Sequence, residues 1–396
     1  MKLTKIITLI ALLSASLAVS AQVRPKTAPS PTPASGAEIY QTILKTKSVK
    51  VSGISPQTQK DLDHAAQLMK SGQFEQSIEV ANKIIKANPR IATIYNNRGY
   101  CYMQLNKLDL AIADFNTALK ISPSALPFIN RGMSFYQKGD TAAAIADLTK
   151  AVSANPKDGL AYSNRGYLYT QNNEFEKAVA DLNKALSISP NEGAYLTNRC
   201  FTYYKMEMLE KALTDCNSAI SANQKIGAAY GNRGAIYLKI SDFKAALADY
   251  DAALKLNNSI PDYHANRGFV LANLNLFQEA VESYSRALEL KPVAAIHLKR
   301  AEAYSKLNNP DLELTDITKA IELEPNNPIP YNNRGVFYLN RKQMSDALND
   351  FSKSIELNPN LIIVYKNRAY LYKKLGENEK AAADQQTAEI LENKEN

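Results

Sequence analysis

Tryptophan is absent from this 396-residue sequence, and cysteine, histidine and glycine are scarce, with three cysteines, three histidines and 15 glycines. The few histidines and cysteines show no spacing typical of a metal site, and no histidine is placed to activate a serine or cysteine nucleophile. No glycine-rich phosphate loop occurs. The sequence therefore predicts a protein that is not an enzyme and that uses no cofactor.

A strong excess of charge of one sign is also missing. The formal net charge is +8, from 47 lysines and arginines and 39 aspartates and glutamates, and the lysines are scattered through predicted turns and helix ends. Nucleic-acid binding requires basic residues gathered on one face. We therefore expect a protein or peptide partner and no nucleic-acid partner.

Only the N-terminus carries a long apolar run. Lys2 and Lys5 precede the apolar residues 6–19, and residues 19–21 are small, as signal peptidases prefer. The run is short for a membrane span. It predicts a signal peptide over residues 1–21, cleaved before Gln22, and hence an exported protein of the periplasm or the extracellular space with no integral membrane segment afterwards. The alternative is an uncleaved N-terminal anchor.

The main feature present is a repeat. Residues 162–169 (YSNRGYLY) return with substitutions about every 34 residues from residue 92 to the C-terminus, and such a period indicates a stack of helical units. A small residue always follows the Asn-Arg pair or its equivalent. An aromatic residue, two alanines and usually a closing proline come after it at fixed offsets. The small column consists of Gly99, Gly132, Gly166, Cys200, Gly234, Gly268, Ala301, Gly335 and Ala369.

These columns resemble the tetratricopeptide repeat family, in nine copies over residues 92–396 and a weaker copy over residues 58–91. The resemblance implies an all-α fold, a right-handed α-solenoid or superhelix of about ten helical hairpins whose first helices line a concave groove. Residues 22–57 are predicted to form a Pro/Ser/Thr-rich linker followed by an N-terminal capping helix.

An asparagine precedes the arginine in eight of the nine copies, and only Lys299 departs. This column is similar to the asparagine ladder in the superhelix of the O-linked N-acetylglucosamine transferase. An amide can bond both the C=O and the N–H of an extended main chain. The predicted peptide-binding residues are these asparagines and the rings three positions further along: Asn97, Asn130, Asn164, Asn198, Asn232, Asn266, Asn333, Asn367, Tyr100, Tyr167, Phe201, Phe269 and Tyr370.

The alternative is that these rings only pack between adjacent first helices and that the asparagines bind nothing. The predicted function is thus a peptide-binding adaptor or assembly factor of the cell envelope. The competing hypothesis is a structural scaffold that uses its convex face or its ends, with self-association through the ends of the array.

Two further columns predict structural pairing. An aspartate column in the second helices recurs at a fixed offset from the arginine column and predicts an ion pair within or between hairpins, with ligand contact as the alternative. Ser283 interrupts the aspartates, so either Arg267 or Arg300 faces no carboxylate. Cys200 and Cys216 occupy facing slots of one hairpin, which is compatible either with a disulfide or with two packed thiols.

One copy is irregular. Besides Lys299 in the asparagine column, Glu313 replaces an alanine where the helices cross, and Pro310 is predicted to begin the second helix. The irregular copy is either a loosened seam or a distinct sub-site.

Overall fold

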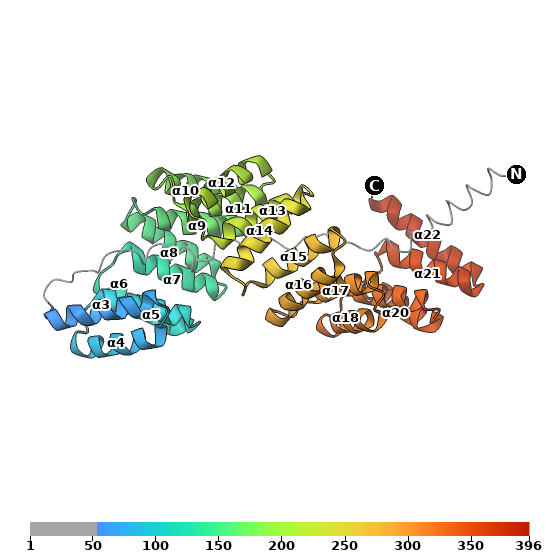
Figure 1. The fold of residues 1–396 in the computed structure, drawn as a ribbon, viewed down its shortest axis with the longest axis horizontal. Helices are drawn as coiled ribbons and strands as arrows, with labels where there is room; N and C mark the ends of the chain where they lie inside the picture. Colours follow the sequence, from blue (N-terminus) through green and yellow to red (C-terminus); the bar gives the residue numbers. More distant parts are fainter. Residues whose placement is uncertain (1–53, 396) are drawn as a thin grey trace. The chain divides into compact units, whose positions relative to one another are not determined.

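The computed structural model describes residues 54–395, and the predicted signal peptide and capping helix lie outside them. Within these residues every regular element is an α-helix, and 20 helices follow one another as hairpins of a first and a second helix (Figure 1). The predicted all-α solenoid of helical hairpins is confirmed.

The described residues form two compact units, divided after Asn257. The first unit contains α3 (Pro56–Lys70), α4 (Phe74–Ala87), α5 (Ala92–Gln104), α6 (Leu108–Ile121), α7 (Ala125–Gln137), α8 (Thr141–Ala154), α9 (Gly159–Gln171), α10 (Phe175–Ile188), α11 (Gly193–Lys205), α12 (Leu209–Ala222), α13 (Gly227–Lys239) and α14 (Phe243–Leu256). The second unit contains α15 (Pro261–Asn273), α16 (Phe277–Leu290), α17 (Ala294–Lys306), α18 (Pro310–Leu323), α19 (Pro328–Asn340), α20 (Met344–Leu357), α21 (Ile362–Leu375) and α22 (Asn378–Glu395). Pro310 begins α18, as predicted.

The small column lies where the two helices of a hairpin cross. A Cβ added to Gly99 would lie 2.8 Å from Cε1 of Phe115, and one added to Gly335 would lie 2.6 Å from Cε1 of Phe351. These distances are shorter than carbon–carbon contacts in packed cores. A ring of the second helix therefore fills the space that a larger residue of the first helix would need.

Each hairpin turn contains one residue with positive φ, a conformation that costs least for glycine. Gly72, Gly139 and Gly376 fill three of these turns. The other turns use non-glycine residues at the same place: Asn106, Asn173, Glu207, Ser241, Asn275, Asn308 and Lys342. The turn geometry is therefore constant although its sequence is not.

First helices of neighbouring repeats contact one another in the unit of residues 54–257, from α5 through α7, α9 and α11 to α13. The second helices make their principal contacts with first helices. Because a curved layer is most closely spaced on its inner side, the first helices form the inner face of this unit. Across residues 54–395, no helix combines the length and the apolar character needed to cross a bilayer.

Candidate functional site

Eight arginines hold their hairpins together. Each donates from Nε and Nη2 to both carboxylate oxygens of the aspartate 16 residues later, at 2.6–2.9 Å. This two-pronged geometry suits a guanidinium and a carboxylate. The pairs are Arg98 with Asp114, Arg131 with Asp147, Arg165 with Asp181, Arg199 with Asp215, Arg233 with Asp249, Arg300 with Asp316, Arg334 with Asp350 and Arg368 with Asp384. The predicted structural pairing is confirmed.

Seven of these eight arginines also bind the preceding repeat. Nη1 of Arg165 donates to Thr149 Oγ1 at 3.3 Å, and the guanidinium lies between the rings of Tyr162 and Tyr169, at 5.7 and 5.9 Å from their centroids. The hydrogen bond to Asp181 raises the pKa of Arg165, against the opposite effect of burial. Equivalent bonds to the preceding second helix join Arg98 to Asn82, Arg131 to Asn116, Arg199 to Asn183, Arg233 to Asn217, Arg300 to Ser285 and Arg368 to Ser352.

The structure decides which arginine faces Ser283. Pairing occurs within a hairpin, so Arg267 donates from Nη1 to Ser283 Oγ at 2.6 Å, whereas Arg300 retains Asp316. Asp316 also bonds Nδ1 of the buried His297 at 2.7 Å. Burial raises the pKa of Asp316, but the hydrogen bonds from Arg300 and with His297 outweigh burial and lower it below its ordinary value.

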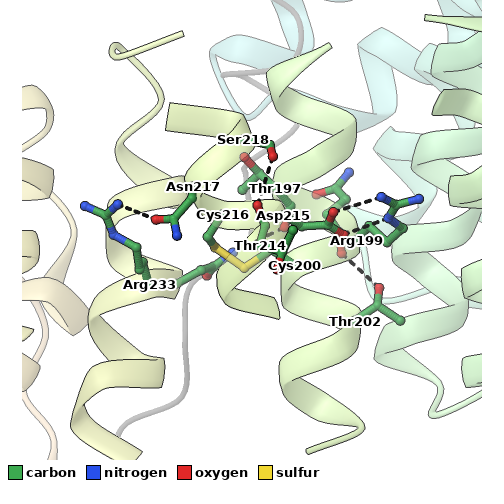
Figure 2. The surroundings of a disulfide bond; sticks show 12 residues. Thr197, Arg199, Cys200, Thr202, Thr214, Asp215, Cys216, Asn217, Ser218 and Arg233 are labelled. Carbon is green, nitrogen blue, oxygen red and sulfur yellow. Dashed lines mark hydrogen bonds and ion pairs between the residues drawn. A yellow bond between two sulfur atoms is a disulfide. The ribbon is translucent and has the colours of Figure 1, made fainter. Parts of the chain in front are cut away.

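A disulfide joins Cys200 of α11 to Cys216 of α12, with the two Cα atoms 5.4 Å apart (Figure 2). Both residues are fully buried. The disulfide lies at the helix crossing, where most other hairpins pack a glycine of the first helix against a larger side chain of the second helix. Next to it, Arg199 pairs with Asp215 of the same hairpin, and Asn217 accepts from Arg233 of the following repeat. Cys101 is a buried free thiol, and burial raises its pKa to about 11.

The asparagine column lies between consecutive first helices. Nδ2 of Asn130 donates to Asn96 Oδ1 at 2.9 Å, and Nδ2 of Asn198 donates to Ser163 Oγ at 3.1 Å. The same kind of bond joins Asn232 to the Thr197 carbonyl at 3.4 Å and Asn367 to Asn332 at 2.9 Å. Asn97 and Asn333 are partly exposed. The remaining asparagines of the column are buried: Asn130, Asn164, Asn198, Asn232, Asn266 and Asn367.

Several amide oxygens of this column lack a hydrogen-bond donor. Oδ1 of Asn130, Asn198 and Asn232 is buried and has no hydrogen-bond partner among residues 54–395, as is also true of Oδ1 of Asn266 in the second unit. Buried acceptors without a donor are uncommon in folded proteins. In the first unit, therefore, the amide nitrogens join neighbouring repeats while the oxygens form a recurring set of unused acceptors.

The predicted rings differ in accessibility between the two units. In the first unit Tyr100 and Phe201 are buried and Tyr167 is partly buried. The ring of Tyr167 lies 5.8 Å from that of Tyr136 and 6.3 Å from that of Phe201, centroid to centroid. These rings therefore pack between adjacent first helices.

In the second unit Phe269 is partly buried, like Tyr167, and Tyr370 is 38% exposed. Of the predicted rings, Tyr370 is therefore the one most open to solvent.

An ion pair joins the irregular repeat to the next repeat. Glu313, at the helix crossing, lies 3.4 Å from Nη2 of Arg341 in the next repeat, and the Arg341 guanidinium lies 3.6 Å from the centroid of the Phe337 ring. Burial raises the pKa of Glu313, and Arg341 acts against this. Among residues 54–395, no group of three or more histidine, cysteine, aspartate or glutamate residues is arranged to hold a metal ion.

Comparison with protein families agrees with the hairpin architecture. Models of the tetratricopeptide repeat match residues 92–124 and 328–361, residues 129–193 and 232–295, and residues 294–327. Together these matches span more than half of the chain.

Individual proteins match over shorter lengths or at low identity. A FAM10 family protein of Arabidopsis thaliana is 39% identical over 85 residues, which are 21% of this chain and 19% of that protein. The chain thus spans about a fifth of that relative. A structure of a monomeric mutant of IFIT1 with Gppp-AAAA superposes with a TM-score of 0.56 at 15% identity, over 85% of this chain and 82% of that one. PilW, a type IV pilus biogenesis factor, has a TM-score of 0.46 at 18% identity, over 51% of this chain and 94% of that one.

Proposed function

This chain belongs to the tetratricopeptide repeat family, whose members are protein-interaction modules, and we propose that it binds an extended segment of a partner protein on the face formed by its first helices. It would act there as an adaptor or assembly factor of the cell envelope, with no catalytic step of its own.

The observation that carries this proposal is the recurring set of amide oxygens without a donor at Asn130, Asn198 and Asn232. Each unsatisfied buried acceptor costs about 1–3 kcal/mol. An extended main chain on the first-helix face would present N–H groups that could satisfy these acceptors. Because the three side chains are at most 1% exposed, we expect the neighbouring first helices to separate slightly when a segment binds.

Export is part of the proposal. Its support is the signal-like N-terminus together with the Cys200–Cys216 disulfide, since disulfides persist in oxidising compartments. Cell fractionation should place the protein in the periplasm or the medium, and mass spectrometry of the isolated protein should show Gln22 as its first residue. Recovery from the cytosol with Met1 or Lys2 first would contradict export.

The binding experiment compares two double variants that lose similar inter-repeat bonds. Asn198→Ala with Asn232→Ala removes two asparagines of the inner column, whereas Asn183→Ala with Asn217→Ala removes two acceptors of the arginine Nη1 contacts. Partners captured from the envelope fraction by crosslinking are identified with the parent chain, and one of them is purified for binding measurements.

We expect the inner pair to lose the purified partner while the outer pair retains it, at matched helical content and melting temperature. Equal binding by both double variants would favour the scaffold that uses its convex face or its ends. Self-association through the ends remains a prediction, and sedimentation of the purified chain over a range of concentrations measures it.

A further inference from the structure

The two units present different inner faces. In residues 54–257, buried amides and rings fill most of the slots where first helices face one another, and of the predicted asparagines and rings only Asn97 and Tyr167 are partly exposed. In residues 258–395, Asn266 and Asn367 are buried, but the slots around α17 and α19 are more open: the side chains of Lys299 and Glu302 are 22% and 34% exposed, and Asn333 and Val336 are partly exposed. A partner can therefore reach this second face without any prior rearrangement.

The inner face loses its asparagine contacts at the irregular repeat. Four asparagines of the column donate to an acceptor in the preceding first helix: Asn130, Asn198, Asn232 and Asn367. The position that holds the acceptor for Asn367 corresponds, in the repeat before Asn333, to Leu298, whose side chain has no acceptor. In α17 the donor asparagine itself is replaced by Lys299. Helix α17 packs less extensively against α19 than against α15, and α19 packs less extensively against α17 than against α21. The inner face is therefore loosest at α17 and α19.

Charge on the open face is mainly positive. The inner slots of a first helix are the asparagine-column position, the positions 4 and 1 before it and the positions 3, 6 and 7 after it. From α5 to α13 these slots carry charge only at the C-terminal ends of the helices, at Lys205 and Lys239. In the second unit the same slots carry the two acidic residues Asp262 and Glu302 and these lysines: Lys299, Lys306, Lys366, Lys373 and Lys374. Lysines of like charge on one face favour an acidic partner.

Most of this charge is available to a partner. Within residues 258–395, no ion pair joins Lys306, Lys373 or Lys374 to a carboxylate, whereas Lys366 pairs with Glu392. Lys299 bonds Glu302 at 3.1 Å through a partly exposed pair within one helix, and such pairs contribute little stability. A carboxylate from outside could replace Glu302 at low cost.

Apolar contacts accompany the lysines. The Phe269 ring lies beneath Lys299, 5.6 Å from its Nζ, and the Tyr370 ring lies 5.3 Å from Nζ of Lys374. Val336 lies in the corresponding slot of α19. Rings and a valine beside lysines provide both burial for apolar side chains and charge-assisted hydrogen bonds for carboxylates.

We infer that the face formed by α15, α17, α19 and α21 is the first contact site for the partner, and that the bound segment is extended and acidic, with apolar residues among its carboxylates. This inference rests on the proposed function and specifies its location and ligand class. Carboxylate side chains bind Lys299 and Lys306, and apolar side chains pack on Phe269 and Val336.

The test uses residues 22–396 and a phage-displayed library of random 12-residue peptides. Peptides enriched on the protein are synthesised with a fluorophore, and their affinity is measured by anisotropy at two salt concentrations. The test variant is Lys299→Glu with Lys306→Glu. The control, Lys319→Glu with Lys353→Glu, changes the net charge equally at lysines of second helices that pair with Glu322 and Glu356.

We expect the enriched peptides to be rich in aspartate and glutamate, and their affinity to fall with added salt. The test variant should bind them at least about 10-fold more weakly, whereas the control should stay within about twofold of the parent chain. Lys299→Asn restores the residue of the other eight repeats and should fold normally. We expect this substitution alone to weaken binding several-fold, as estimated for the loss of one exposed charge contact.

Three results would overturn the inference. Enrichment of neutral or basic peptides would exclude an acidic segment. This face would be excluded if acidic peptides bound the folded Lys299→Asn and double-glutamate variants as tightly as the parent. If peptide binding were instead lost in Asn198→Ala with Asn232→Ala, the proposed function would stand with its site in the first unit. If no peptide is enriched, both the inference and the proposed peptide-binding function fail.

Discussion

Reduction of the Cys200–Cys216 disulfide should weaken the hairpin of α11 and α12 selectively. The bond closes a loop with a sequence separation of 16, and a crosslink around a loop of this length stabilises by about 3 kcal/mol through the unfolded chain. In a repeat array, this loss is felt mainly by one hairpin and its neighbours. We therefore expect backbone amides of α11 and α12 to exchange roughly 100-fold faster after reduction, given a tenfold change for every 1.4 kcal/mol.

Hydrogen-exchange mass spectrometry of the oxidised and reduced chain measures this change, with α7 and α8, which do not adjoin the disulfide hairpin, as the internal reference. Cys101→Ala in every sample removes the third thiol. The matched control is Cys200→Gly with Cys216→Leu, which installs the residue pair that Gly166 and Leu182 form in the preceding repeat. Reductant should leave this control unchanged.

Equal exchange of α11 and α12 in the oxidised and reduced forms would refute the reasoning. So would an equal response of the disulfide-free control, because the effect would then come from the reductant and not from the crosslink. Faster exchange spread evenly over the first unit would instead show that the unit unfolds as a whole, against the local behaviour expected of a repeat array.

Three further predictions concern the packing, the turns and the buried charges. Gly335→Ala should lower the free energy of unfolding by about 1–2 kcal/mol, because its Cβ would meet the Phe351 ring at 2.6 Å, and Phe351→Leu in the same chain should recover part of the loss in urea titrations. Lys342→Gly should raise the melting temperature, since Lys342 has a φ of 61° and a left-handed residue other than glycine costs about 1–2 kcal/mol; Gly376→Ala at the equivalent turn should lower it. The pKa of Asp316 is lowered in the folded chain, so its contribution to stability is present above the unfolded value of about 3.9 and is lost as the pH falls below it. Asp316→Asn should therefore be less stable than the parent at pH 7 and should lose less stability between pH 5 and pH 3. A parallel loss of stability in both chains would contradict this sign.

Much of the fold follows from single columns of the sequence, each of which reports a local requirement. A small residue is needed where helices cross, as the approach of Phe115 to Gly99 shows. The arginine column implied a carboxylate partner because an unpaired guanidinium in a helix interface is costly. The second role of these arginines, their Nη1 contacts to the preceding repeat, was not predicted from the sequence. The signal was nevertheless present, since the acceptors, such as Asn183 and Asn217, recur at one slot of the second helices.

The candidate site was less predictable. The asparagine column was expected to line an open groove, but six of its eight members are buried between first helices. Four of the six donate from the amide nitrogen to the preceding repeat. Whether a helix slot is open depends on how closely the next helix approaches, which involves residues some 34 positions away. Asn130 and Asn333 occupy the same slot, yet only Asn130 meets an acceptor, Asn96, in the helix before it. Their roles in peptide binding stay predictions.

The hairpin architecture and the existence of arginine–aspartate pairs were readable from the amino acids alone, because both depend on columns that recur often enough to be recognised. The choice of Arg267 as the arginine facing Ser283, the disulfide between Cys200 and Cys216, and the contrast between a sealed and an open inner face required three-dimensional packing. These features depend on how the two helices of a hairpin meet and on the spacing between consecutive first helices, and no single repeat encodes that spacing.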